Sequence, residues 1–330
     1  MAIEVVPQDL MASRFAISPL IETMHAQWVL AGRYRAGAHR EWARRWRETY
    51  RGLVREYPVL RAAPAISGNR GADNVDFIAP PPTAVDVPFE AELAAMRATP
   101  PEQAHAEISQ VLAVRPPVPA WARDLLLRPD VVDLFADAYA AVWAEIISRD
   151  WPRLRAILQR DVAQRAGQLA AYGWQAALED LDPRVRWRAE GLIEVEMTAA
   201  KQVRLGGKGL LFLPSAFMTD IAVYAEDAWP YALIYPARGV AVPQPAPGGL
   251  AELVGRSRAR ILAELAVPAT TTQLAAVLGL SPGTTSEHLS ALRRTGLIVG
   301  TRVGRGVRYA RTPLGDALTA GPPVSGLAAQ

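Results

Sequence analysis

The last third of the chain carries the clearest periodic pattern of apolar and polar positions. Apolar residues recur every three or four positions from Leu250 to Leu265, which predicts an amphipathic helix that ends before Pro268. A shorter helix is predicted to begin after Thr270, because Thr270 and Gln273 have the spacing of a capping box. Gly279 suits the left-handed position that closes this second helix.

A third helix follows after a short turn. Ser281 is its predicted N-cap, and Pro282 occupies the first helical position, where a missing N–H costs nothing. On a helical wheel Thr285, Leu289 and Leu292 share one face, which we expect to pack on the two preceding helices. This spacing is typical of a helix-turn-helix, whose second helix enters the major groove of DNA.

Two strands are predicted after the third helix. They run from Leu297 to Val303 and from Val307 to Arg311, and they flank Gly304-Arg305-Gly306, so we expect a β-hairpin with a basic tip. Along the second strand arginine alternates with apolar residues, which predicts one basic and one apolar face. A hairpin in this place is a wing, and a last short helix is predicted to begin at Thr312.

The larger amino-terminal region changes from a helical to a strand-like pattern. Ser18 and Pro19 indicate the start of its first helix. Further helices are predicted at 39–57, 88–97, 102–114, 131–148 and 152–172, and strands at 192–197, 203–205, 210–213 and 231–235. The fold class is therefore α+β: a large, mainly helical domain with a small antiparallel sheet, followed by the winged helix-turn-helix.

A stretch rich in proline and glycine separates these two parts. We predict an amino-terminal domain over residues 1–235 for dimerisation or effector binding, and a semi-rigid linker over 236–249. The winged helix-turn-helix then occupies 250–318, and 319–330 form a flexible tail.

Composition excludes several classes of function. The chain of 330 residues has no cysteine, which excludes disulfides, thiolate metal sites and catalytic thiols, and its four histidines lie far apart. We therefore expect no metal and no cofactor. Residues 1–15 do not have the pattern of a signal peptide, and no apolar stretch approaches the roughly 20 residues of a membrane span. We expect a cytoplasmic protein that does not bind membranes.

The positive charge is concentrated at the carboxy-terminal end. The whole chain has 36 basic and 33 acidic side chains, a net charge of +3. Residues 250–320 contain nine arginines against four acids, a net +5, which leaves −2 for the remainder. The positive potential therefore belongs to the small domain, as binding to double-stranded DNA requires.

The third helix and the wing supply the expected DNA contacts. We expect them from Ser281, Gly283, Thr284, Ser286, Glu287, His288, Ser290, Arg294, Arg302, Arg305, Arg308 and Arg311. Glu287 is interpreted either as an acceptor for cytosine N4 or as a solvated surface acid. Arg305 suits a narrow minor groove, and the other arginines of the wing suit phosphates.

Particular motifs support this interpretation. They are Leu278-Gly279-Leu280-Ser281, the run from Ser286 to Leu292, Gly296-Leu297-Ile298, and a Gly-Arg-Gly wing followed by Tyr309. In these motifs, the segment of residues 250–318 resembles the winged helix-turn-helix of the ArsR-like bacterial transcriptional regulators. The resemblance implies DNA binding. The resemblance does not extend to metal sensing. Metal-sensing members carry cysteines on the first helix of the motif, which corresponds to Thr272 to Leu278 in this sequence, and this chain has no cysteine.

The beginning of the chain has a second resemblance. Phe15 and Ser18-Pro19-Leu20 are similar to the opening of an uncharacterised amino-terminal domain in longer actinobacterial ArsR-like regulators. This resemblance implies no ligand and no catalytic residue.

Aromatic residues on two predicted helices give a candidate ligand site. Trp42, Trp46 and Tyr50 lie on one stripe of the helix at 39–57, and Trp143 lies on the helix at 131–148. Two interpretations remain open: a hydrophobic core, or the wall of a pocket for a flat hydrophobic effector. Gly206 to Gly209 lack the spacing of a phosphate-binding loop and are interpreted as a hairpin turn.

We therefore expect a sequence-specific transcriptional regulator, acting as a repressor and a homodimer on a pseudo-palindromic operator. Control by a small-molecule effector at the amino-terminal domain is a further hypothesis. The alternative is an enzyme or a protein-interaction module with an appended winged helix. We expect no enzyme, because no catalytic motif can be identified in the sequence.

Overall fold

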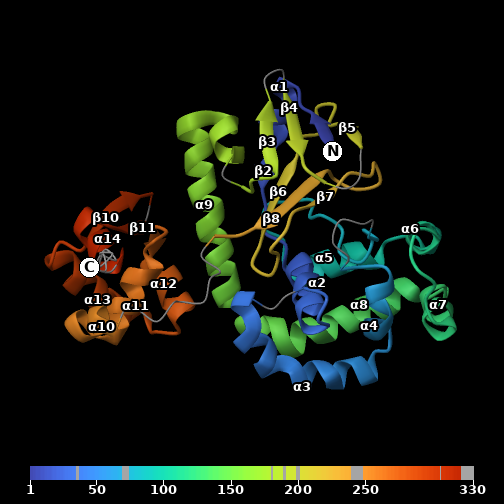
Figure 1. The fold of residues 1–330 in the computed structure, drawn as a ribbon, viewed down its shortest axis with the longest axis horizontal. Helices are drawn as coiled ribbons and strands as arrows, with labels where there is room; N and C mark the ends of the chain where they lie inside the picture. The colour runs from blue at the N-terminus through green and yellow to red at the C-terminus, as the bar shows by residue number, and fades with distance from the viewer. Residues whose placement is uncertain are drawn as a thin grey trace, which may run out of the picture. The chain divides into compact units, whose positions relative to one another are not determined.

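The chain folds into two compact units (Figure 1). The computed structural model describes residues 1–34, 37–68, 74–179, 181–188, 191–197, 201–238, 248–304 and 306–320. The N-terminal unit comprises Met1–Trp151 and Arg165–Ala237, and the C-terminal unit comprises Pro152–Gln164 and Arg238–Gln330. Most of the predicted linker at 236–249, and the predicted tail from residue 321 onward, lie outside the described residues.

Helix α8 is the centre of the helical part of the N-terminal unit. The helices are α1 (Pro7–Ala12), α2 (Pro19–Leu30), α3 (Arg40–Glu56), α4 (Val59–Ala62), α5 (Phe89–Arg97), α6 (Pro101–Ala113), α7 (Ala120–Leu126) and α8 (Val131–Val142), with 3-10 turns at Gly37–His39 and Ala63–Ala65. Helix α8 contacts α2, α3, α4, α5 and α6, because its stripe of Val131, Phe135 and Tyr139 is completely buried. A π turn, Trp143–Ile147, continues it into α9 (Ser148–Glu179).

The strands of the N-terminal unit form two mixed sheets. One has the order β3-β4-β1-β5, with β1 (Ala2–Glu4), β3 (Val185–Arg188), β4 (Leu192–Val195) and β5 (Gln202–Arg204). The other has the order β2-β6-β8-β7, with β2 (Arg14–Phe15), β6 (Leu211–Ser215), β7 (Ala222–Tyr224) and β8 (Ala232–Pro236).

The prediction of a small antiparallel sheet is therefore wrong in part. Strand β1 is parallel to β5, and β6 is parallel to both β2 and β8. Parallel neighbours require a long crossover connection, and here the whole helical region connects β2 to β6. Such a pairing leaves no local pattern in the sequence.

The glycine-rich segment between β5 and β6 is a turn, but it is not the predicted hairpin, because the two strands belong to different sheets. The buried carboxylate of Asp9 accepts hydrogen bonds from the backbone N–H groups of Gly207, at 2.7 Å, and Gly209, at 3.1 Å. In a phosphate-binding loop such backbone N–H groups donate to the phosphate. Here they donate to the side chain of Asp9 instead.

A buried carboxyl group joins α5 to the beginning of α2. Ser18 caps α2 as predicted, since its Oγ accepts from the N–H of Ile21 at 3.0 Å. Glu92 Oε2 accepts from the Ser18 hydroxyl at 3.0 Å and from the N–H of Leu20 at 2.8 Å. The side chain is 3% exposed, and this burial raises the pKa of Glu92 to about 8.

We expect the contribution of Glu92 to stability to fall as the pH rises from its ordinary pKa, 4.5, to about 8. Over this window the folded protein holds a proton that the unfolded chain releases, which costs up to about 1.4 kcal/mol of unfolding free energy per pH unit. Glu92→Gln keeps an acceptor oxygen and cannot ionise, so it flattens this dependence. Urea denaturation of both proteins across the window measures the difference, and equal slopes would contradict the assignment.

The C-terminal unit contains the predicted winged helix-turn-helix elements. They are α10 (Gly248–Val254), α11 (Arg256–Glu264), β9 (Ala269–Thr270), α12 (Thr271–Leu278), α13 (Pro282–Arg294), β10 (Ile298–Val303), β11 (Gly306–Arg311) and α14 (Pro313–Ala320). The helix predicted at 250–265 is divided at Gly255, which has a φ of 83°. Glycine adopts this conformation without a steric penalty, so Gly255 ends α10 by donating its N–H to Ala251.

Candidate nucleic-acid interface

The turn between α12 and α13 is fixed by the predicted caps. Thr270 Oγ1 accepts from the N–H of Gln273 at 3.3 Å, and Gln273 Oε1 accepts from the N–H of Thr270 at 2.9 Å. Gly279 has the left-handed conformation, with φ 66° and ψ 34°. These local features set the direction in which the chain enters α13, and both predictions are confirmed.

Helix α13 is held by its apolar face. Thr285 and Leu289 are completely buried and Leu292 is 1% exposed, as the helical wheel predicts. Leu289 and Leu292 belong to one core with residues of α10, α11, α12 and the base of the wing. Its buried members are Leu250, Ala259, Ile261, Leu262, Leu265, Ala269, Leu274, Leu278, Leu289, Leu292, Leu297 and Ile298. The opposite arc of α13 is consequently turned outward.

Most of the residues predicted to contact DNA from α13 and its N-cap are exposed. They are Ser281, Gly283, Thr284, Ser286, Glu287 and Arg294, whereas His288 and Ser290 are partly buried. The hydroxyls of Ser281 and Thr284 lie 2.8 Å apart, and Ser281 Oγ also accepts from the N–H of Thr284 at 3.1 Å. The arc offers small groups, hydroxyls and one carboxylate, the groups that read base edges in a major groove.

The wing is a three-stranded sheet rather than a hairpin alone. Strand β11 pairs with β10 on one side and with β9, which the sequence analysis missed, on the other. Val303 pairs with Gly306, and Gly304, which follows Val303, has a φ of 57°, a conformation that glycine adopts without strain. Arg305 itself lies outside the described residues.

The predicted division of the wing into a basic and an apolar face is wrong. Arg302 lies opposite Val307 in the ladder, and Arg308 lies opposite Thr301. Directly opposed residues share a face and successive residues alternate. The two arginines therefore lie on opposite faces of the wing, and Arg302 shares its face with Val307.

Arg311, the last predicted contact, is engaged within the domain. Its guanidinium forms an ion pair with Asp316 at 2.9 Å and donates to Thr319 Oγ1 at 2.6 Å. Both partners belong to α14, so Arg311 fastens this helix to β11. Arg302 is exposed and Arg308 is half-buried, which leaves these two as the described arginines of the wing best placed for phosphates.

A segment of α9 belongs to the C-terminal unit, and the sequence analysis missed this. Arg160 Nη1 donates to Glu264 Oε2 at 3.1 Å, and Nη2 donates to the carbonyl oxygens of Glu264 and of Val267, the latter at 2.8 Å. Both side chains are buried, 3% and 8% exposed. Ala156 and Ile157 pack beside this pair against Val277 of α12. Glu264 is a charged residue among the apolar positions of α11. This is the one feature of the sequence that indicates a buried charge in need of a partner.

The aromatic residues predicted to bind a ligand are packed among helices of the N-terminal unit. The indole N–H groups of Trp42 and Trp46 both donate to Asp150 Oδ2 at 2.9 Å. Tyr50 accepts a hydrogen bond from Gln27. Trp143 stacks on Phe89 with ring centres 4.4 Å apart. Tyr50 also lines an open pocket together with Leu30 and Arg47. A more enclosed cavity exists elsewhere in this unit, and none of the four predicted residues lines that cavity.

The described residues contain no group of three His, Asp or Glu side chains arranged to hold a metal ion. No helix among them is long and apolar enough to cross a membrane.

Comparison with known proteins gives one match. Residues 256–301, from the start of α11 into β10, match the model of a family described as a helix-turn-helix domain. No curated protein and no solved structure matches the chain. The matched segment contains α12, the turn and α13, the elements whose caps and buried face are described above. The chain therefore carries a helix-turn-helix domain, which indicates a DNA-binding and regulatory role.

Proposed function

We propose that the protein is a sequence-specific transcriptional regulator that binds its operator as a homodimer and represses transcription. The observation that carries this proposal is the outward arc of α13, made of small and polar side chains, beside a wing with Arg302 and Arg308. The concentration of positive charge in the same domain supports it.

The two parts of the interface have different tasks in this proposal. Helix α13 enters the major groove, where Thr284 and Glu287 reach base edges. The tip of the wing enters the neighbouring minor groove. Because Arg302 and Arg308 lie on opposite faces of the wing, each neutralises a phosphate on a different side of that groove.

The helices that flank the motif support a dimer. Leu253 on α10 is 70% exposed, and Leu314 on α14 is 55% exposed. Exposed apolar side chains at these places suit an interface between two copies. A two-fold dimer reads half-sites separated by about one helical turn, or roughly 10 base pairs, so the operator is pseudo-palindromic.

Within the described part of the N-terminal unit, a serine, a histidine and a carboxylate meet at Ser215, His25 and Glu22, which is a candidate for a catalytic role. Ser215 Oγ and Glu22 Oε1 lie 2.9 and 3.9 Å from the same atom, His25 Nδ1. A catalytic triad requires the serine and the carboxylate on different ring nitrogens, and this serine is completely buried. The arrangement supports a binding unit rather than an enzyme.

The salt dependence of DNA binding tests this proposal. If a dimer contacts about eight phosphates, its affinity for the DNA upstream of its own gene falls roughly 10³- to 10⁵-fold between about 50 and 200 mM salt. Fluorescence anisotropy measures this dependence, with a shuffled duplex of equal length as control. Binding that is absent, or equal on both duplexes, would refute sequence-specific recognition, and sedimentation of the free protein as a monomer would refute the dimer.

A further inference from the structure

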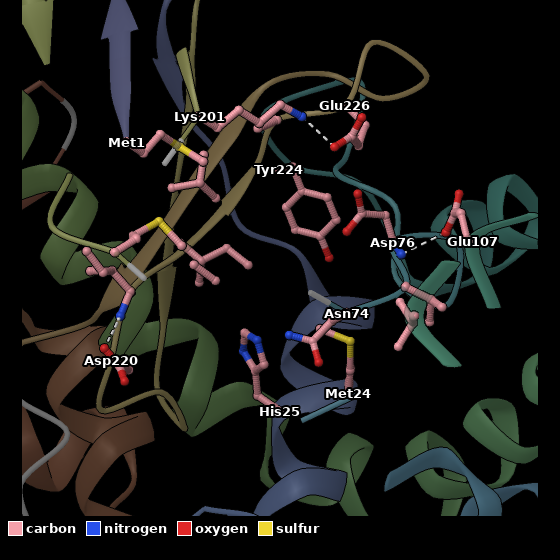
Figure 2. Close-up of a pocket in the computed structure, with 18 of the residues that line it drawn as sticks. Met1, Met24, His25, Asn74, Asp76, Glu107, Lys201, Asp220, Tyr224 and Glu226 are labelled. Atoms are coloured by element: carbon pink, nitrogen blue, oxygen red, sulfur yellow. Dashed lines mark hydrogen bonds and ion pairs between the residues drawn. The ribbon is translucent and has the colours of Figure 1, made fainter. Parts of the chain in front are cut away.

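The N-terminal unit contains a partly open cavity of about 190 Å³ (Figure 2). Met24 and His25 of α2 form one wall, and Tyr224 of β7 faces them. The side chains of all three are buried, the most exposed of them, Tyr224, at 6%. An ion pair between Lys201 and Glu226 lies at the end of the lining away from His25.

The hydrogen bonds around Ser215 determine the tautomer of His25. Ser215 Oγ accepts from the backbone N–H groups of Phe217, at 3.3 Å, and Met218, at 3.2 Å, and lies 2.9 Å from His25 Nδ1. A hydroxyl has one proton and two acceptor lone pairs. Because two N–H groups occupy the lone pairs, the Ser215 proton is donated to Nδ1. The proton of a neutral His25 therefore lies on Nε2.

This Nε2–H group is a buried donor without an acceptor. Among the described residues, none forms a hydrogen bond with His25 Nε2. Burial lowers the pKa of His25, although the Glu22 carboxylate acts in the opposite direction, so the ring is neutral. Nε2 itself has almost no accessible surface, so an acceptor on a bound molecule reaches it only after the imidazole ring shifts toward the cavity. An unpaired buried donor costs folding free energy, and the new hydrogen bond removes this cost.

The carboxylates of the lining make the cavity unfavourable for anions. Glu107 accepts from the backbone N–H groups of Asp76, at 2.8 Å, and Phe77, at 2.9 Å. Asp220 is paired with Arg184, and Glu226 is paired with Lys201. The lining thus contains four carboxylates, including that of Asp76, against one lysine and the terminal amine of Met1. A ligand carboxylate would add to this negative charge.

We propose that this cavity binds a small uncharged molecule with an apolar part, which packs against apolar side chains of the lining such as Val111 and Ile221, and with an oxygen, for example that of an amide, which accepts from His25 Nε2. A ligand of about eight or nine non-hydrogen atoms fits this partly open cavity, because a closed cavity of about 150 Å³ accepts benzene, which has six. The binding depends on the N-terminal unit alone. Its use as an effector site rests on the proposed regulatory function.

Two probes of equal size, one neutral and one negatively charged, test the cavity. Benzamide is neutral and carries an amide, whereas benzoate has the same ring and a negative charge. Saturation-transfer NMR titration of the full chain with each probe measures the dissociation constants. We expect benzamide to bind at least tenfold more tightly than benzoate, because only benzoate adds charge beside the carboxylates.

Two variants locate the binding, and a third serves as control. His25→Phe keeps a ring but removes the donor, so it weakens benzamide binding about two- to tenfold, the usual contribution of one neutral hydrogen bond.

Ala222→Phe fills the cavity from β7, an edge strand, and abolishes binding even if His25→Phe folds poorly. Ala222 alternates with Val223 and so shares the face of Tyr224. Tyr172→Ala, at a residue that is 76% exposed, leaves binding unchanged.

Several results would overturn the cavity proposal. Among them are equal binding of both probes, binding that survives Ala222→Phe, and no binding of benzamide at all. Each of these outcomes leaves the DNA titration unaffected. Conversely, loss of DNA binding with intact benzamide binding would refute the proposed regulation and keep the cavity as a binding site.

Discussion

Replacing both Arg302 and Arg308 by alanine is expected to lower the affinity for operator DNA about 10³- to 10⁴-fold at roughly 0.1 M salt. Each phosphate contact contributes close to one logarithmic unit of counterion release under these conditions, and a dimer loses four contacts. The slope of log K against log salt therefore becomes shallower by about 3 to 4. Anisotropy titrations at several salt concentrations measure both quantities.

Two further pairs of variants distinguish the effect of where the arginines lie from the effect of their charge. Arg302→Lys with Arg308→Lys keeps the charges and most of the salt dependence. Arg123→Ala with Arg128→Ala removes the same charge from exposed sites in the N-terminal unit and leaves affinity nearly unchanged. If Arg123→Ala with Arg128→Ala lowers the affinity as much as Arg302→Ala with Arg308→Ala, net charge accounts for binding and the wing has no specific role.

Arg160→Ala is expected to destabilise the C-terminal unit by about 3 to 5 kcal/mol, because it leaves a carboxylate unpaired in the interior. The Glu264 carboxylate and two backbone carbonyls lose their donor together. Calorimetry and circular dichroism of the full chain measure the loss. One consequence is that a DNA-binding fragment beginning at residue 250 lacks this partner, whereas the complete unit includes residues 152–164.

Matched variants show whether burial is the cause. Arg149→Ala breaks an ion pair with Glu145 in which both side chains are more than half exposed, and it removes a cation–π contact with Trp46. Together these losses cost at most about 1.5 kcal/mol. Replacing Arg160 and Glu264 together by methionine removes both buried charges and recovers much of the stability. A loss for Arg160→Ala no greater than that for Arg149→Ala would mean that the buried pair does not hold α9 to α11.

The sequence was sufficient where short-range chemistry determines the structure. The cap at Ser281, the capping box at Thr270 and the left-handed Gly279 each depend on residues within four positions, and all three are confirmed. The buried face of α13 follows from helical periodicity alone. The family match over 256–301 falls on these same elements.

The sequence was insufficient where distant segments meet. The strands β1 and β2 at the start of the chain join sheets formed by residues 185–236, and nothing local encodes such a pairing. The same holds for Arg160 with Glu264 and for His25 with Ser215. Helix α2 offers one signal in retrospect: every residue from Pro19 to Val29 is buried, so its polar members require partners elsewhere.

The aromatic stripe illustrates a different limit. Periodicity assigned Trp42, Trp46 and Tyr50 to one face, but it could not distinguish a packed core from a cavity wall. Their partners within the helical part are Asp150 and Gln27. The effector hypothesis therefore moves to the cavity beside His25, which aromatic periodicity does not mark.

A hydroxyl-radical footprint on the DNA upstream of the protein's own gene tests the central claim most directly. The proposed function predicts two protected half-sites with centres about one helical turn apart, related by an approximate two-fold axis. It also predicts that Arg302→Ala with Arg308→Ala abolishes the protection at the same protein concentration. Uniform cleavage along the duplex with the wild-type protein would contradict the account.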